Sequence, residues 1–367
     1  MQNENRRGTT DRGDLSRCES VNLSDDGRRH ATIGSAVTPL TTVRGKRFLM
    51  GSRPSFSALP DVSSESQVTV EPRCSEAIRL RSDILPASRS LLVQISVGYE
   101  LVYNLPQRTP MVLMVRIHPS RAADLVVSDQ VVTDPPVPVT DYHDSFGNLV
   151  SRIVAPSGMM RISACGVVND GGLPDAVAPN ANQHPVEDLP QETLLYLLGS
   201  RYCDTDHLSD IAWGLFGSAP VGWGRVQAIC DFVHNHLIFG YQHARPTKTA
   251  WEAYQERAGV CRDFAHLAIT FCRCMNIPAR YCTGYLGDIG VPPMDAPMDF
   301  SGWFEAWLGG RWYTFDARFN TPRIGRVLIA RGRDAADVAI ATTFGPSPLV
   351  SFKVATDELV GAGGGTG

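Results

Sequence analysis

The chain has 367 residues, of which 43% are hydrophobic and 20% are charged, and its net charge is −4 at neutral pH. This composition is typical of a globular protein with two or three domains, and it gives no general electrostatic reason to bind nucleic acid or an anionic membrane. No run approaches the ~18 consecutive apolar residues of a membrane span, and the N-terminus lacks the apolar core of a secretory signal. We therefore expect a cytoplasmic protein that binds neither nucleic acid nor membrane.

The first 90 residues differ in composition from the rest of the chain. They are rich in Ser, Arg and Gly, and no apolar period is sustained between Met1 and about Ser90. Such a segment buries too little apolar surface to offset the entropy lost on ordering it. We therefore predict that residues 1–90 are a disordered or non-native N-terminal extension and that residues 351–367, which end in GAGGGTG, form a flexible tail.

A small all-β domain is predicted for residues 91–180. Short β-branched and aromatic runs alternate there with turn residues, as in LLVQISVGYELVY from Leu91 and GNLVSRIV from Gly147. The stretch GGLPDAVAPNANQHP that follows is rich in Gly, Pro and Asn, which is typical of a linker between domains.

The second domain, residues 190–350, begins with helical patterns. The segment GRVQAICDFVHNHL has apolar residues at the spacing of one buried helical stripe, and TAWEAYQERAG predicts a short helix stopped by Gly259. DLPQETLLYLLGSRYC predicts an earlier helix whose apolar face includes Leu194, Leu195, Leu197 and Leu198.

The next segment, VCRDFAHLAITFCRCMNIPARYCTGYLG, predicts a buried helix with Cys261 in its first turn and then a strand. SGWFEAWLGGRWYTFDAR predicts a hairpin that turns at Gly309 and Gly310, and further extended runs follow it. Helices followed by antiparallel strands are typical of an α+β domain. The order therefore predicts a helix N-terminus bearing Cys261 that faces a sheet.

The position of Cys261 has a chemical meaning. A thiol at a helix N-terminus experiences the positive end of the helix dipole and free backbone N–H groups, which favour the thiolate. The same N–H groups can stabilise an oxyanion on an acyl group that the sulfur has attacked. Gly259 lets the chain turn tightly into this helix. On position alone, however, a first-turn cysteine is more often a small buried hydrophobic residue.

The run AGVCRDFAHLAITFCRCMNIPARYCTGYL, followed by GWFEAWLGGRWYTFDAR, resembles the core of the transglutaminase-like superfamily, in particular the transglutaminase-like cysteine proteases of bacteria. The resemblance extends over about residues 91–350, because the preceding β unit is similar to the N-terminal domain that accompanies this core in bacteria. It implies a papain-like α+β core in which a Cys attacks a carbonyl carbon, a His carries the proton and an Asp orients the His.

Residue by residue, the resemblance implies that Cys261 is the nucleophile and Asp316 the orienting acid. The family histidine stands two residues before the Trp of the W-x-E strand, and Ser301 occupies that position here. An imidazole exchanges a proton near neutrality, whereas a serine hydroxyl does not. Similar chains with DFSAW in this strand carry DARHN where this chain has DARFN, so their imidazole would come from the position of Phe319.

Other histidines remain as candidates for the base, although none follows residue 266. His266 lies five residues beyond Cys261, a rotation of about 140° on a helix, so it should point largely away from the sulfur. His243 could approach from a loop. We keep both as possible auxiliary residues, together with Trp303 as a possible wall of a substrate groove.

No cofactor and no metal is predicted. His234 and His236 differ by about 200° on a helix and should face apart, and no Gly-rich phosphate loop is present. Two functions remain open. The first is a cysteine hydrolase or acyltransferase that acts on peptide or isopeptide amides of a protein substrate, impaired by Ser301. The alternative is a catalytically degenerate member of the fold that serves as a binding or scaffolding module, and the oligomeric state stays open.

Overall fold

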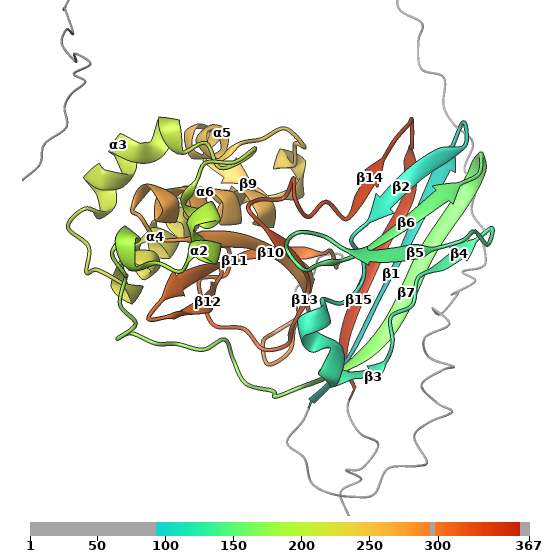
Figure 1. Ribbon diagram of the computed structural model, residues 1–367, viewed down its shortest axis with the longest axis horizontal. Helices are drawn as coiled ribbons and strands as arrows, with labels where there is room; N and C mark the ends of the chain where they lie inside the picture. The colour runs from blue at the N-terminus through green and yellow to red at the C-terminus, as the bar shows by residue number, and fades with distance from the viewer. Residues whose placement is uncertain (1–92, 294–297, 360–367) are drawn as a thin grey trace, which may run out of the picture. The chain divides into compact units, whose positions relative to one another are not determined.

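The computed structural model describes residues 93–293 and 298–359, so the predicted N-terminal extension at 1–90 lies outside the described residues. The described chain is α+β, as expected. Most strands of two antiparallel sheets come first, followed by a group of helices and a third antiparallel sheet, and the last two strands return to the first two sheets (Figure 1). No helix within these two ranges is long and apolar enough to cross a membrane.

The first sheet has the order β15-β1-β7-β3, with β4 also paired to β7. Its strands are β1 (Val93–Leu105), β3 (Leu125–Val127), β4 (Val132–Asp134), β7 (Gly158–Asp170) and β15 (Leu349–Leu359). Alternate residues of β1 are buried, as the period of a half-buried strand requires. The sequence interpretation identified β1 but did not include the run that forms β7, its central partner.

The second sheet has the order β14-β2-β6-β5. Its strands are β2 (Thr109–Leu113), β5 (Thr140–His143), β6 (Leu149–Ala155) and β14 (Ala341–Thr343), and the 3₁₀ helix η1 (Pro119–Asp124) follows β2. Buried residues of both sheets belong to one continuous hydrophobic core, which extends into the helical part of the chain.

The prediction of a flexible tail at 351–367 is wrong for residues 351–359. These residues belong to β15, which pairs antiparallel with β1 from Gln94↔Leu359 to Tyr103↔Leu349. In Figure 1 the red strand β15 lies beside the blue strand β1. The alternation in LVSFKVATD indicated a strand, but its partner lies about 250 residues earlier, and local patterns carry no information on such pairing.

The helices are α2 (Gln191–Leu194), α3 (Thr205–Phe216), α4 (Trp223–His236), α5 (Ala250–Glu256) and α6 (Cys261–Cys274). The buried stripe expected on α4 is confirmed, and α3 was not predicted. The long helix expected around DLPQETLLYLLGSRYC is instead three short turns, η2 (Val186–Asp188), α2 and η3 (Leu195–Leu197). Three of the leucines assigned to its apolar face are exposed: Leu194, Leu195 and Leu198.

The third sheet has the order β12-β11-β10-β13, and α6 packs on β10 and β11. Its strands are β10 (Ala279–Leu286), β11 (Ser301–Leu308), β12 (Arg311–Phe315) and β13 (Arg326–Gly332). The predicted β11–β12 hairpin is confirmed, and its two turn glycines have φ values of 55° and 84°, which favour glycine. A short parallel pair, β8 (Ile238–Phe239) and β9 (Ala258–Gly259), with η4 (Tyr241–His243), completes the domain.

The β13 strand joins the third sheet to the first β unit, which consists of the first and second sheets and the short segments between their strands. The Asn148 side chain accepts a hydrogen bond from the Arg331 N–H at 2.9 Å and donates one to the Arg331 carbonyl at 2.9 Å. The His118 N–H donates to the Leu328 carbonyl at 2.8 Å. Backbone groups of β13 that would otherwise form a free sheet edge are therefore paired with the β unit.

Candidate active site

Cys261 is the first residue of α6, as predicted. The turn that leads into the helix is held by Asp263, whose carboxylate accepts a hydrogen bond from the Val260 N–H at 3.0 Å. A Cβ at Gly259 would lie 2.6 Å from the Cβ of Asp263, so only glycine allows this close approach. The local sequence GVCRD thus explains why the cysteine stands at the open end of a helix.

The half-buried Cys261 lines a narrow cavity of about 40 Å³. Both positions that the sequence interpretation linked to a missing histidine, Ser301 and Phe319, line the same cavity. The structure therefore brings the nucleophile position and both histidine positions together. Other polar or charged residues of the wall are Tyr241, Asp288, Asp299 and Arg318.

The electrostatic surroundings of Cys261 differ from those expected at a helix N-terminus. Burial raises the pKa of the Cys261 thiol to about 11, and the negative charge of Asp299 adds to this rise. The Arg318 guanidinium and a hydrogen bond from the Gly302 N–H act in the opposite direction but do not compensate. The thiol is therefore the dominant form at neutral pH, so the thiolate expected from the helix dipole is not favoured.

Asp316 is buried just after β12, and among the described residues none of its hydrogen-bond partners is an imidazole. Its Oδ1 accepts hydrogen bonds from the N–H groups of Arg318 and Phe319 at 3.0 and 3.2 Å. Its Oδ2 accepts from Nη2 of Arg326 at 3.0 Å. The carboxylate thus shapes the loop that carries Arg318 and Phe319 to the cavity, and it forms an ion pair with a buried guanidinium.

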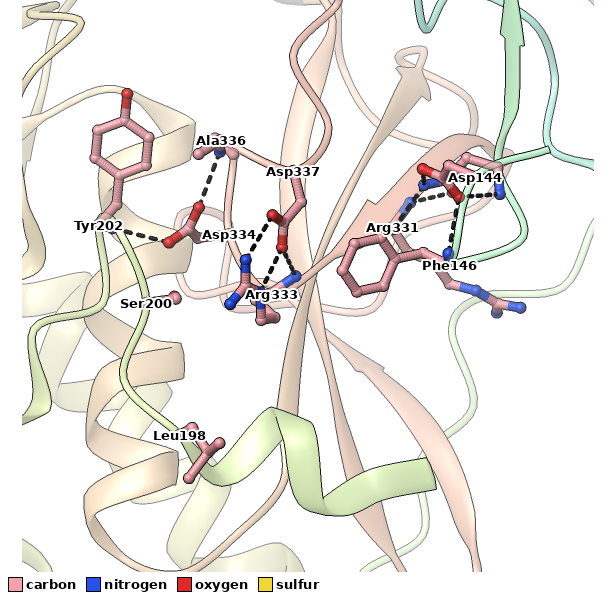
Figure 2. Close-up of polar contacts among 12 residues, drawn as sticks. Asp144, Phe146, Leu198, Ser200, Tyr202, Arg331, Arg333, Asp334, Ala336 and Asp337 are labelled. Atoms are coloured by element: carbon pink, nitrogen blue, oxygen red, sulfur yellow. Dashed lines mark hydrogen bonds and ion pairs between the residues drawn. The ribbon is translucent and has the colours of Figure 1, made fainter. Parts of the chain in front are cut away.

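His266 is fully buried and does not line the Cys261 cavity. Its Nε2 accepts a hydrogen bond from the Ala335 N–H at 3.1 Å, and its ring stacks on that of Tyr202 with centroids 5.1 Å apart. Figure 2 shows that Asp334 binds the N–H groups of Tyr202 and Ala336 in the same region. His266 therefore helps to hold the loop after β13 in place, which is the role of a buried structural residue.

The two remaining candidates, His243 and Trp303, also do not line the Cys261 cavity. His243 lies in η4 and its Nε2 accepts a hydrogen bond from the Gln242 amide at 3.3 Å. Trp303 is buried and lies beside Arg326, whose guanidinium carbon is 5.0 Å from the ring centroid. Among the eight histidines of the described ranges, none lines the cavity of Cys261.

Sequence reasoning missed three of the charged or polar residues that line the cavity: Tyr241, Asp288 and Arg318. Arg318 follows Asp316 by two residues in DARFN, and Tyr241 lies in a loop far from Cys261 in the chain. The proximity of Arg318 to the motif aspartate was an available signal, whereas nothing local marks Tyr241.

Comparisons with known proteins agree with this geometry. A family model described as the transglutaminase-like superfamily matches residues 214–317, which include Cys261, Ser301 and Asp316. The crystal structure of a putative cysteine protease from Cytophaga hutchinsonii is 30% identical to the chain and superposes with a TM-score of 0.64. That alignment covers 73% of this chain and 91% of the Cytophaga chain, so it includes regions outside the matched core.

A curated relative matches over a shorter segment. An uncharacterized protein of Mycobacterium leprae is 36% identical over 95 residues, which is 24% of this chain. The chain spans about a third, 32%, of the length of that relative.

Proposed function

Because the chain belongs to the transglutaminase-like superfamily, we propose that it is a thiol-dependent hydrolase or acyltransferase that forms a thioester on Cys261. Its substrates would be peptide or isopeptide amides of a protein, turned over slowly because Ser301 replaces the proton-carrying histidine. The observation that carries the proposal is the cavity that joins Cys261 to Ser301 and Phe319 at the open end of α6.

In the proposed reaction a thioester forms on Cys261 while the amide bond of the substrate breaks. The Cys261 sulfur attacks the acyl carbon, the carbon–nitrogen bond breaks, and the thiol proton has to reach the leaving amine. Water or an amine then attacks the thioester and returns the proton to the sulfur. The Gly302 N–H that points at the sulfur and the Arg318 guanidinium supply positive charge for the anionic species.

Proton transfer is the weak point of this site. Asp299 is the carboxylate of the cavity wall that raises the pKa of the Cys261 thiol, and burial raises the pKa of Asp299 itself. It is therefore the group of this wall best placed to accept the thiol proton in place of an imidazole. General acid–base assistance contributes ~10²–10⁴-fold, so amide cleavage should be slow. Thioesters and activated esters, whose leaving groups depart as stable anions, should be affected less.

Trapping of an acyl-enzyme tests the proposal. The full chain is incubated with p-nitrophenyl acetate, and the site of acetylation is identified by mass spectrometry of peptides. We expect acetyl-Cys261 to form and to disappear in Cys261→Ala, whereas Cys165→Ala, at another half-buried free cysteine, should leave acetylation of Cys261 unchanged. Absence of a Cys261 adduct at any ester concentration would reject the enzyme.

A second function, a binding or scaffolding module of the same fold, is favoured by a different observation. The Asp316 carboxylate is engaged by the buried Arg326, and the Cys261 thiol has a raised pKa, so two of the three catalytic positions are poorly arranged for turnover. This alternative predicts no acyl-enzyme, and Cys261→Ala would then leave the binding of the protein's partner unchanged.

A further inference from the structure

We propose that a second cavity, between the first β unit and the third sheet, binds a small organic carboxylate. This junction cavity has a volume of about 280 Å³, compared with about 40 Å³ at Cys261. Its walls come from η1, the end of β7, the linker after β7, and strands β11 to β13. Among its lining residues are Arg323, Arg326 and Arg331, together with the buried Trp303.

Two of the arginines that line the junction cavity each have one side-chain N–H group without a hydrogen-bond partner. The side chains of Arg323 and Arg326 are 4% and 7% exposed, yet Nε of the first and Nη1 of the second are buried without a hydrogen-bond partner. A buried donor without an acceptor is costly, so each indicates a missing partner. Arg331, from β13, also lines the cavity and has no ion pair among the described residues.

The acidic residues of the same wall are already engaged. Asp170 accepts from Arg121 at 3.1 Å, Asp175 accepts from Nε of Arg326 at 2.9 and 3.1 Å, and Glu305 accepts from Nε of Arg280 at 2.6 Å. The carboxylates of the wall are therefore paired, whereas Arg331 has no ion pair and Arg323 and Arg326 each retain one unpaired N–H group. A complementary ligand has to present oxygen acceptors, and the unpaired Arg331 favours one with a negative charge.

The charge balance of the wall favours a carboxylate over a phosphate. The three carboxylates Asp170, Asp175 and Glu305 line the cavity beside the guanidinium groups, and they would repel a dianion more strongly than a monoanion. A carboxylate also matches the planar donor pair of a guanidinium. Trp303 and Leu328 supply apolar surface to the cavity wall for the rest of the molecule.

The test measures binding to the full chain by isothermal titration calorimetry at constant ionic strength. Benzoate, its neutral isostere benzamide and inorganic phosphate are the probes. We expect saturable binding of benzoate and none of benzamide or phosphate. Arg331→Gln should weaken benzoate binding at least ~10-fold, the effect of losing a charge-assisted contact. Arg152→Gln, at an exposed arginine of β6 outside the cavity, is the matched control and should bind as the unmodified chain does.

The assignment would be overturned by the absence of saturable heat from benzoate, by tighter binding of phosphate than of benzoate, or by unchanged benzoate binding in Arg331→Gln. The measurement does not depend on the chemistry of Cys261. Benzoate binding in Cys261→Ala should equal that of the unmodified chain, and a loss there would place the carboxylate in the cysteine cavity and contradict the proposal.

Discussion

Arg326 donates a hydrogen bond from Nη2 to Oδ2 of Asp316 at 3.0 Å, and both side chains are buried. The superfamily resemblance assigns this carboxylate to the orientation of a histidine, but here a guanidinium holds it. Arg326 also pairs with Asp175, so one buried cation links the aspartate after β12 to the linker that follows β7. Asp316 thus has a structural role that does not require catalysis.

Asp316→Asn tests this role. The amide oxygen can still accept the two N–H bonds of the loop, but the buried Arg326 loses one of its two countercharges. Breaking a buried ion pair costs about 3 kcal/mol or more, and the remaining partner should reduce this to about 1–3 kcal/mol in urea denaturation. Glu100→Gln, which removes more exposed ion pairs on β1, is the control and should cost under about 1 kcal/mol. Equal losses in the two variants would contradict the structural role.

Alkylation of Cys261 by iodoacetamide should report its raised pKa. Because the thiolate reacts and the pKa of the native thiol is about 11, the rate should climb with pH up to that value. At pH 8 we expect the native residue to react roughly 10- to 100-fold more slowly than the same residue in urea, measured by peptide mapping. Rapid labelling at pH 6 that is lost on unfolding would show an activated thiolate and contradict this expectation.

The charges around the sulfur should shift that pH profile in opposite directions. Asp299→Asn removes a negative charge that raises the pKa of Cys261, so the profile should move to lower pH. Arg318→Gln removes a positive charge that lowers this pKa, so the profile should move to higher pH. Shifts of the same sign in the two variants would mean that altered packing, rather than charge, controls the thiol.

The sequence predicted the elements whose determinants are local. The apolar period of α6 placed Cys261 in its first turn, and the two glycines at 309 and 310 predicted the β11–β12 hairpin. The proximity of Cys261 to Ser301 was also predictable, because the family resemblance implies that the start of the cysteine-bearing helix lies beside the start of the W-x-E strand.

Relations between distant segments were not predictable from one sequence. The pairing of β15 with β1 and the ion pair of Arg326 with Asp175 both join residues more than 150 positions apart. The raised pKa of Cys261 has a similar origin, because burial by surrounding elements outweighs the favourable helix N-terminus. Periodicity identifies the faces of an element but not what covers them.

Acid should destabilise the chain through His118. Burial, with the nearby charges of Arg331 and Arg280, lowers the pKa of His118 to about 4. The unfolded state, with an ordinary imidazole pKa near ~6.5, therefore binds more protons between these values. The free energy of unfolding should fall as the pH drops through this window, by up to ~1.4 kcal/mol per pH unit from this residue.

His118→Asn measures that contribution, because the amide oxygen can replace Nδ1 as the acceptor of the Ser120 N–H. Urea denaturation between pH 7 and 4 should show a shallower loss of stability in this variant than in the unmodified chain. His207→Asn, at an exposed histidine of α3, should retain the full slope. Parallel slopes in all three proteins would show that His118 is not the group responsible.

Ser301→His tests whether the cysteine cavity lacks only its proton carrier. The new imidazole would stand on the wall of the cavity that holds Cys261, where it can form an ion pair with the thiolate and lower the thiol pKa. We expect the rate of amide hydrolysis to rise by ~10²-fold, in the lower part of the range for general acid–base assistance. The gain is limited because Asp316 still forms an ion pair with Arg326 and does not orient the new imidazole. The new activity should follow a titration near pH ~6.5.

Ser301→Asn is the matched control, because it adds a polar side chain of intermediate size that does not titrate. Phe319→His places the imidazole at the other candidate position on the same wall, next to the N–H that binds Asp316. Gain of amidase activity in either histidine variant, absent in Ser301→Asn and abolished by adding Cys261→Ala, would support a catalytic site that is intact apart from the imidazole. If neither histidine variant hydrolyses amides while both still fold, the binding module becomes the better description, because the engaged Asp316 and the protonated thiol then limit the site independently of residue 301.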